Sequence, residues 1–264
     1  MANESARLPS RILTISRNAF REAVRDRILY NLILFVLLIT ASAIFLSELS
    51  AGQESRVIVN LGLSVLLIFG TFISIFVGVS LVWKEIEKRT VYSIFSKPIG
   101  RGEFIIGKYI GLCLTLLVNV AIMGIGVSLA LLYVGNPSLA GKIWPAVLLI
   151  FFELTIVTAV AIMFSSFSTP ALSALLTFFV FIIGNFSASL RELAQGMNSA
   201  AARAVFEGIY YVLPNLSHFS FITETSNGMT PPASMIGGSI LYAIVYDIIL
   251  LTITVLIFTR RNFK

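Results

Sequence analysis

The sequence predicts an all-α integral membrane protein with six transmembrane helices, built as a single domain over residues 1–264. Of its 264 residues, 57% are hydrophobic and only 12% are charged, whereas a soluble domain has about 45–50% apolar and about 25% charged residues. The apolar residues also form long runs, and roughly 20 helical residues suffice to cross a hydrocarbon core of about 30 Å. So little charge cannot give a globule of this size a polar surface, which excludes a soluble enzyme.

Six apolar segments are long enough, or nearly so, to cross a membrane. Because the bilayer interior has no water to pair backbone N–H and C=O groups, such continuous runs predict helices rather than barrel strands. The polar tract Ser165–Pro170 predicts a tight turn between the fourth and fifth segments. The predicted spans are residues 28–47, 57–82, 109–134, 143–166, 170–190 and 236–258.

Lys and Arg residues are unequally distributed between the two sides of these spans. Six precede the first span, six lie in residues 83–108 and three follow the sixth span, whereas four lie in the remaining loops. Since cytoplasmic loops carry the excess of positive charge, we expect both termini and residues 83–108 to be cytoplasmic. Residues 191–235 then form an external loop, in which residues 198–213 predict a short helix.

Residues 10–27, ahead of the first span, have the pattern of an amphipathic helix. Apolar residues recur at helical spacing from Ile12 to Val24, and Arg17, Arg21 and Arg25 fall on the opposite face. Such a helix is expected to lie in the inner membrane interface, with its arginines toward anionic lipid. The pattern is compatible both with a simple anchor and with a functional elbow.

Residues 83–108 form the longest predicted cytoplasmic connection, and they begin as a charged helix. Glu85 and Arg89 are an i, i+4 pair in this helix, and Lys97-Pro98 ends it because proline cannot continue a helix. A short charged helix below the membrane suits docking to a soluble partner. The simpler interpretation of the residues alone is a solvated, positively charged loop.

Residues Gly102–Tyr109 nearly match the phosphate-binding loop G-x-x-x-x-G-K-[ST]. Tyr109 stands where a Ser or Thr hydroxyl must ligate Mg²⁺, so we expect no ATP site here. If ATP drives this protein, another chain must bind the nucleotide and Mg²⁺. Within the same segment, Gly107 and Gly111 form a G-x-x-x-G motif, which lets two helices approach closely.

Two acidic residues, Glu153 and Asp247, lie inside predicted spans, and we expect them at similar depths. A charge in the membrane interior is costly, so such residues are candidates for a functional role such as proton or substrate handling. The alternative is a protonated acid that hydrogen-bonds to a neighbouring helix. With His218 and Cys113 as the single histidine and cysteine, we expect no metal site and no cofactor in this chain.

Three segments together resemble one family of transport proteins. They are the basic N-terminal helix, the run from Trp83 to Lys108 with its Ser96-Lys97-Pro98-Ile99 segment, and Leu213-Pro214-Asn215-Leu216 before the last span. In this combination the chain resembles the type-2 ABC exporter permeases. It is most similar to the branch grouped with copper-enzyme maturation transporters, such as the nitrous-oxide-reductase assembly system.

The resemblance implies a transporter in which two permease subunits pair and two separate ABC ATPase subunits dock below them. Residues 10–27 would be the elbow helix, residues 191–215 an external re-entrant or capping element, and a helix within 84–97 the coupling helix. The location implied is the inner (plasma) membrane of a prokaryote, and the cargo is left open. The residues assigned to ATPase coupling are Glu85, Glu87, Lys88, Arg89, Lys97, Arg101 and Glu103.

Two other functions are compatible with the sequence. An ion-coupled secondary transporter would use Glu153 and Asp247 as proton-linked sites, and a non-transporting membrane assembly factor would need no turnover at all. A nucleic-acid partner is not expected, because the predicted cytoplasmic segments account for the net charge of +6.

Overall fold

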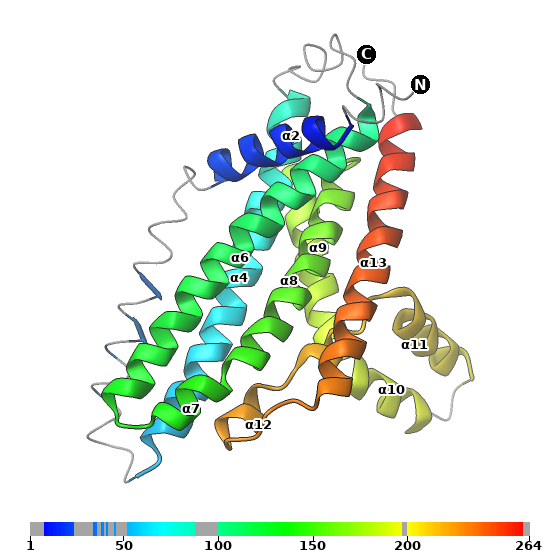
Figure 1. The fold of residues 1–264 in the computed structure, drawn as a ribbon. Helices are drawn as coiled ribbons and strands as arrows, with labels where there is room; N and C mark the ends of the chain where they lie inside the picture. The colour runs from blue at the N-terminus through cyan, green and yellow to red at the C-terminus, as the bar shows by residue number, and fades with distance from the viewer. Residues whose placement is uncertain are drawn as a thin grey trace.

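The structure is a computed structural model, and it describes residues 8–23, 34–35, 38–39, 41, 45, 52–87, 100–196 and 200–260. These residues form helices joined by turns and loops (Figure 1), which confirms the all-α fold class. The helices are α2 (Leu8–Ala23), α4 (Glu54–Glu87), α6 (Arg101–Tyr133), α7 (Pro137–Lys142), α8 (Trp144–Ser165), α9 (Pro170–Asn185), α10 (Ser187–Gly196), α11 (Ala200–Val212), the 3₁₀ helix η2 (Leu216–Phe219), α12 (Ile222–Ser226) and α13 (Ala233–Arg260).

The long helices form a bundle around α8, which contacts α4, α6, α9 and α13. Helix α2, the start of α6 and the last turns of α4 and α13 lie at one end of this bundle (Figure 1), which we call the basic end because it carries Arg11, Arg17, Arg21, Arg101 and Arg260. Helices α7, α10, α11 and α12 lie at the opposite end. The two charge-rich segments that flank the predicted spans therefore meet at one end of the bundle.

Four stretches of the described chain are long and apolar enough to cross a membrane, and they lie in α4, α6, α7–α8 and α13. They correspond to the predicted second, third, fourth and sixth spans. Helix α9 has 16 residues, or about 24 Å at a rise of about 1.5 Å per residue, which is less than the hydrocarbon core of about 30 Å. The fifth span is therefore not shown by α9 alone, and most of the first lies outside the described residues.

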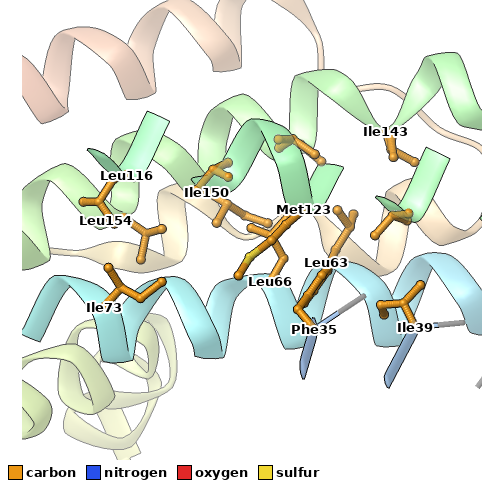
Figure 2. Close-up of a cluster of buried hydrophobic side chains, with 14 of the residues drawn as sticks. Phe35, Ile39, Leu63, Leu66, Ile73, Leu116, Met123, Ile143, Ile150 and Leu154 are labelled. Atoms are coloured by element: carbon orange, nitrogen blue, oxygen red, sulfur yellow. The ribbon is translucent and has the colours of Figure 1, made fainter. Parts of the chain in front are cut away.

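Described residues of the predicted first span pack into the main apolar cluster of the bundle. Figure 2 shows Phe35 and Ile39 on the side of the cluster near Leu63 of α4, with Met123 of α6 beside Leu66 in its middle. The Phe35 ring also meets the Phe69 ring edge-on, with 6.3 Å between centroids. These contacts place the two residues beside α4, where close packing rather than water exclusion stabilises helix association in lipid.

At the basic end, one helix boundary agrees with the prediction and one differs from it. Helix α4 continues to Glu87, as predicted for the charged helix that leaves the second span. Helix α6 begins at Arg101, inside the predicted 83–108 connection, so the predicted start at residue 109 is corrected. Glu103 lies in the first turn of α6, where a negative charge is favourable at the positive end of the helix dipole. The polar first turns of α6 do not belong to the apolar run, so a prediction from hydrophobicity does not include them.

The second correction concerns the fifth apolar segment and the long loop after it. Helix α9 ends at Asn185 rather than at residue 190, and α10 follows after a turn at Phe186. The predicted loop 191–235 contains α11, η2 and α12, and α11 confirms the short helix predicted within residues 198–213. The tight turn before Pro170 is confirmed by the non-helical residues 166–169, and Pro170 occupies the first turn of α9 where its missing N–H costs nothing.

Candidate functional site

Helix α2 docks on α6 through the two glycines of the G-x-x-x-G motif. A Cβ atom built on Gly111 would lie 2.6 Å from Ala19 Cβ and 2.6 Å from the Ser16 carbonyl oxygen. A Cβ atom on Gly107 would lie 2.7 Å from Ile15 Cγ2. Both distances are far below van der Waals contact, so only glycine permits this approach, and the helix contact predicted from the motif is confirmed.

A buried lysine adds a polar contact to the same interface. Lys108 of α6 lies 3.3 Å from Glu22 Oε2 of α2, and its side chain is 6% exposed whereas that of Glu22 is 40% exposed. The Lys108 ammonium also lies 5.8 Å from the Phe104 ring centroid, within cation–π range. The lysine of the near-matching phosphate loop is thus part of a helix–helix contact, and the segment Gly102–Tyr109 is helical throughout.

The amphipathic pattern predicted for α2 is found, but its apolar face contacts protein. Ser16 and Ala19 are buried against α6, while Arg17 and Arg21 are exposed on the other side. Arg25 lies outside the described residues. Helix α6 covers the Ser16–Ala19 side of α2, and the predicted place of α2 in the membrane interface stays a prediction.

Arg101, predicted as a coupling residue, connects the start of α6 to the end of α13. Its Nη1 donates hydrogen bonds to the carbonyl oxygens of Phe258, at 3.1 Å, and Thr259, at 2.8 Å. The last carbonyl groups of a helix have no intrahelical partner and carry partial negative charge, so a guanidinium there is favourable. The rings of Phe104 and Phe258 stack next to this contact, with 6.1 Å between centroids.

Of the other predicted coupling residues, three lie in described helices and three lie outside the described residues. Glu85 and Glu87 belong to the last turn of α4, and Glu103 to the first turn of α6, where its Oε2 is buried without a hydrogen-bond partner in the described chain. Lys88, Arg89 and Lys97 lie outside the described residues. The structure thus places the flanks of the predicted coupling segment at the basic end (Figure 1).

Glu153 lies in the most buried stretch of α8 and is hydrogen-bonded to α9. Only 1% of its surface is exposed, and Asn185 Nδ2 donates to Glu153 Oε1 at 2.9 Å. The same nitrogen donates to the Phe181 carbonyl oxygen at 3.2 Å. Asn185 was not among the predicted site residues, although a polar amide at the end of an apolar helix was a visible signal.

Asp247 of α13 accepts a hydrogen bond on one carboxylate oxygen, and its other oxygen has no partner among the described residues. Tyr109 of α6 donates to Asp247 Oδ2 at 2.7 Å, while the buried Oδ1 has no hydrogen-bond partner in the described chain. Thr155 of α8 lies next to this carboxyl, but its hydroxyl donates to the Phe152 carbonyl oxygen at 2.7 Å and so cannot also donate to Asp247. Tyr109 was considered only as a misfit in the phosphate loop, and its pairing was not predicted.

The two acids are at similar depth but do not form one site. Glu153 and Thr155, the neighbour of Asp247, are two residues apart on α8, so they are rotated by about 200° around the helix axis. Glu153 accordingly faces α9, whereas Asp247 lies at the junction of α6, α8 and α13. The predicted similarity of depth fits this arrangement, and each carboxyl joins neighbouring helices.

The Leu213-Pro214-Asn215-Leu216 segment fastens the end of α11 to the bundle. The Asn215 N–H donates to the Tyr242 hydroxyl oxygen at 2.8 Å, and the Tyr246 hydroxyl donates to the Val212 carbonyl oxygen at 2.9 Å. Leu216 is fully buried, and a Cβ atom on Gly184 would lie 2.7 Å from the Pro214 carbonyl oxygen. Two tyrosines one turn apart on α13 therefore hold the chain that returns from α11.

Comparison with known proteins identifies a family that matches this chain. No curated protein matches this sequence. Residues 13–263, nearly the whole chain from within α2 to beyond α13, match the family described as ABC-2 family transporter protein. That family comprises membrane-spanning subunits of ABC transporters, which accords with four membrane-length apolar helices and with an ATPase partner in general. The chain belongs to the ABC-2 family of transporter proteins.

Proposed function

We propose that this chain is the permease subunit of an ABC exporter and that it transmits ATP hydrolysis by a separate ATPase subunit to movement of a substrate across the membrane. The ATPase would dock on the basic end, at the turn of α4 that carries Glu85 and Glu87 and on Lys88, Arg89 and Lys97 beyond it. ATP and Mg²⁺ would be bound by that partner. The proposal places the basic end in the cytoplasm of a prokaryotic cell, in keeping with the excess of Lys and Arg there.

The observation that carries the proposal is the set of contacts that join the helices of the basic end. Helix α6 is packed on α2 through Gly107 and Gly111 and is tied to it by Lys108 and Glu22. The same helix is tied to the last turn of α13 by Arg101. A displacement applied between the end of α4 and the start of α6 would therefore act on α2, α6 and α13 together.

Such rigid linkage suits alternating access, in which ATP-driven closure of a motor rocks packed helices between two arrangements. Helix α8 is central and packed on several sides, so it would transmit the movement to the opposite end. The glycine contact between α2 and α6 has no room for repacking, because a single methyl group would collide there. Helix α2 would thus move with α6 as one unit, in the manner of an elbow.

A second permease subunit is part of the proposal. Helix α13 exposes a row of large apolar side chains, among them Leu241, Ile248 and Leu256, which are 65%, 59% and 55% exposed. In a membrane such a face contacts either lipid or another helix. A pair of permeases would give the substrate a path between two chains.

The test is co-expression of the chain with an ABC ATPase from the same organism, followed by co-purification and measurement of ATPase activity. We expect the charge reversals Glu85→Lys and Arg89→Glu to weaken ATPase capture and to lower ATPase activity of the complex severalfold. The membrane fold should persist, because both residues lie at or beyond the end of α4. The matched control is Glu192→Lys, an exposed acid of α10 at the opposite end, which should leave capture and activity unchanged.

Unchanged capture and activity in both charge-reversed variants would contradict the coupling proposal. A secondary transporter would instead move substrate in liposomes without any ATPase and would lose activity on Glu153→Gln. The separate hydrogen bonds of Glu153 and Asp247, to α9 and α6, give that alternative no shared ion site.

A further inference from the structure

At the end opposite to α2, a polar pocket of about 420 Å³ opens between the start of α4, helix α7 and the loop after α12. Two cationic side chains line it, Arg56 from the first turns of α4 and Lys142 from the last turn of α7. Hydroxyl and amide side chains complete much of the wall, among them Ser55, Asn136, Ser138 and Asn227. No carboxylate is among the described residues that line the pocket.

The pocket has a defined wall, because hydrogen bonds link the three segments that form it. Asn136 Nδ2 donates to Ser55 Oγ at 3.3 Å, which joins the α6–α7 turn to α4. Lys142 Nζ donates to the Gly228 carbonyl oxygen at 3.3 Å, which joins α7 to the loop after α12. Asn136 Oδ1 in turn accepts from the Leu139 N–H and so caps α7.

No carboxylate of the described part of the chain neutralises the two cations. Among the described residues, neither Arg56 nor Lys142 forms an ion pair with a carboxylate, whereas Arg203, at the same end, pairs with Glu207 at 2.9 Å. Two unneutralised positive charges in one pocket repel each other and attract an anion. Ser and Asn donors beside Arg and Lys are the groups that proteins use to bind phosphate oxygens.

We propose that this pocket binds a phosphate group, held by Arg56 and Lys142 and oriented by the surrounding hydroxyl and amide donors. The phosphate could belong to a soluble molecule or to a lipid headgroup, since the pocket lies at one end of membrane-length helices. A separate apolar pocket of about 360 Å³ between α6, α8 and Ile236 includes Trp144, two residues beyond Lys142, which makes the lipid source worth a separate measurement. The site is independent of the coupling proposal, because none of its residues lies at the basic end.

The experiment measures binding to the full-length chain in maltoside micelles, which contain no phosphate. In one arm inorganic phosphate is titrated, and in the other phosphatidylglycerol is added as mixed micelles. Ligand that binds the native state raises the midpoint of thermal unfolding, and the stabilisation grows with the logarithm of one plus the ratio of ligand concentration to Kd. We expect Arg56→Gln and Lys142→Gln each to weaken Kd about tenfold, since a hydrogen bond to a charged group contributes at least about that factor, and the double variant to lose binding.

The matched control is Arg203→Gln, which removes a basic residue from the same end but not from the pocket and should bind as the wild type does. Ser138→Asp places a carboxylate at the rim, where Ser138 is exposed, and should abolish binding even if a glutamine variant proves unstable. Stabilisation by inorganic phosphate indicates a soluble ligand, and stabilisation by phosphatidylglycerol alone indicates a lipid headgroup. If neither probe stabilises the protein, or if Ser138→Asp binds as the wild type does, the proposal is overturned.

Discussion

The buried acids of the bundle each have a donor from a neighbouring helix. Asn185 donates to Glu153, and Tyr109 donates to Asp247. An uncompensated polar group in an apolar interior is costly, so such donors stabilise both the acid and the helix pair. One oxygen of Asp247 has no hydrogen-bond partner in the described part of the chain, so the carboxyl depends all the more on the hydrogen bond from Tyr109.

We expect Tyr109→Phe to destabilise the protein by about 1–3 kcal/mol, because it leaves the buried Asp247 carboxyl without its donor. The midpoint of thermal unfolding in detergent should fall. Tyr133→Phe is the control on the same helix, since Tyr133 is 77% exposed, and its midpoint should not change. Adding Asp247→Leu to Tyr109→Phe should restore part of the loss, because removal of both partners leaves no unsatisfied group; an additive double variant would show that the two side chains are not coupled.

Steric limits also act on single residues at the contact between α2 and α6. We expect Gly111→Ala to lower stability by about 1–3 kcal/mol, because its methyl group would overlap Ala19 Cβ and the Ser16 carbonyl oxygen and force the helices apart. Gly238→Ala is the control, since a Cβ atom on Gly238 would meet nothing within 4 Å and alanine is favoured in a helix by about 1 kcal/mol. Thermal unfolding of both variants measures the difference, and equal midpoints would mean that α2 does not dock as described.

At the scale of elements, α11 is held to the bundle chiefly at its carboxyl end. Tyr242 and Tyr246 of α13 contact Asn215 and Val212, the residues that follow and end α11. Exposed apolar residues of α11, such as Val205 and Val212, at 60% and 74% exposure, do not pack on the long helices. The α10–α11 pair is thus attached at its two ends: the start of α10 bonds to Ser217 of η2, and the end of α11 bonds to α13.

We expect the double variant Tyr242→Phe/Tyr246→Phe to raise hydrogen exchange in residues 200–215 while α8 remains protected. Loss of two hydrogen bonds of about 1 kcal/mol each would increase local opening of the attachment severalfold or more. Hydrogen exchange followed by mass spectrometry on the purified protein gives the answer peptide by peptide. A uniform increase of exchange across the bundle would instead indicate global destabilisation. No change in exchange would show that the two tyrosines do not hold α11 to the bundle.

For the whole molecule, local patterns predicted the helices and one contact between them. The apolar runs placed α4, α8 and α13 well, because membrane-length hydrophobicity is a local property. The spacing of Gly107 and Gly111 predicted a close helix contact, since a glycine pair on one face has few other uses in an apolar helix.

Contacts that depend on how distant helices meet could not be predicted in the same way. Lys108 looked like an ordinary basic residue of a loop, because its partner Glu22 is 86 positions away in the sequence. Arg101 looked like a docking residue, yet its guanidinium reaches the carbonyl oxygens of Phe258 and Thr259. Neither contact produces a periodic pattern in the sequence. The hydrogen bond between Tyr109 and Asp247 likewise produces none.

The uneven distribution of charge predicts the orientation of the whole bundle. Exposed arginines of α2 and the end of α13 lie at the basic end, while Tyr133 marks the opposite end of α6. Because positively charged segments are retained in the cytoplasm, Arg17 should face the cytoplasm and Tyr133 the outside. Single cysteines at these two exposed positions, in a Cys113→Ala background, can be labelled with a membrane-impermeant maleimide.

We expect Tyr133→Cys to be labelled in intact spheroplasts and Arg17→Cys only after the membrane is opened, because the reagent cannot cross lipid. Thermal unfolding of the Cys113→Ala protein checks that the background is folded. Labelling of both cysteines from the same side would contradict the bundle itself, since α6 could not then cross the membrane between them. The reverse pattern would leave the fold intact but place the basic end outside, where no ATP-driven motor could reach Glu85 and Arg89, and the coupling proposal would fall with it.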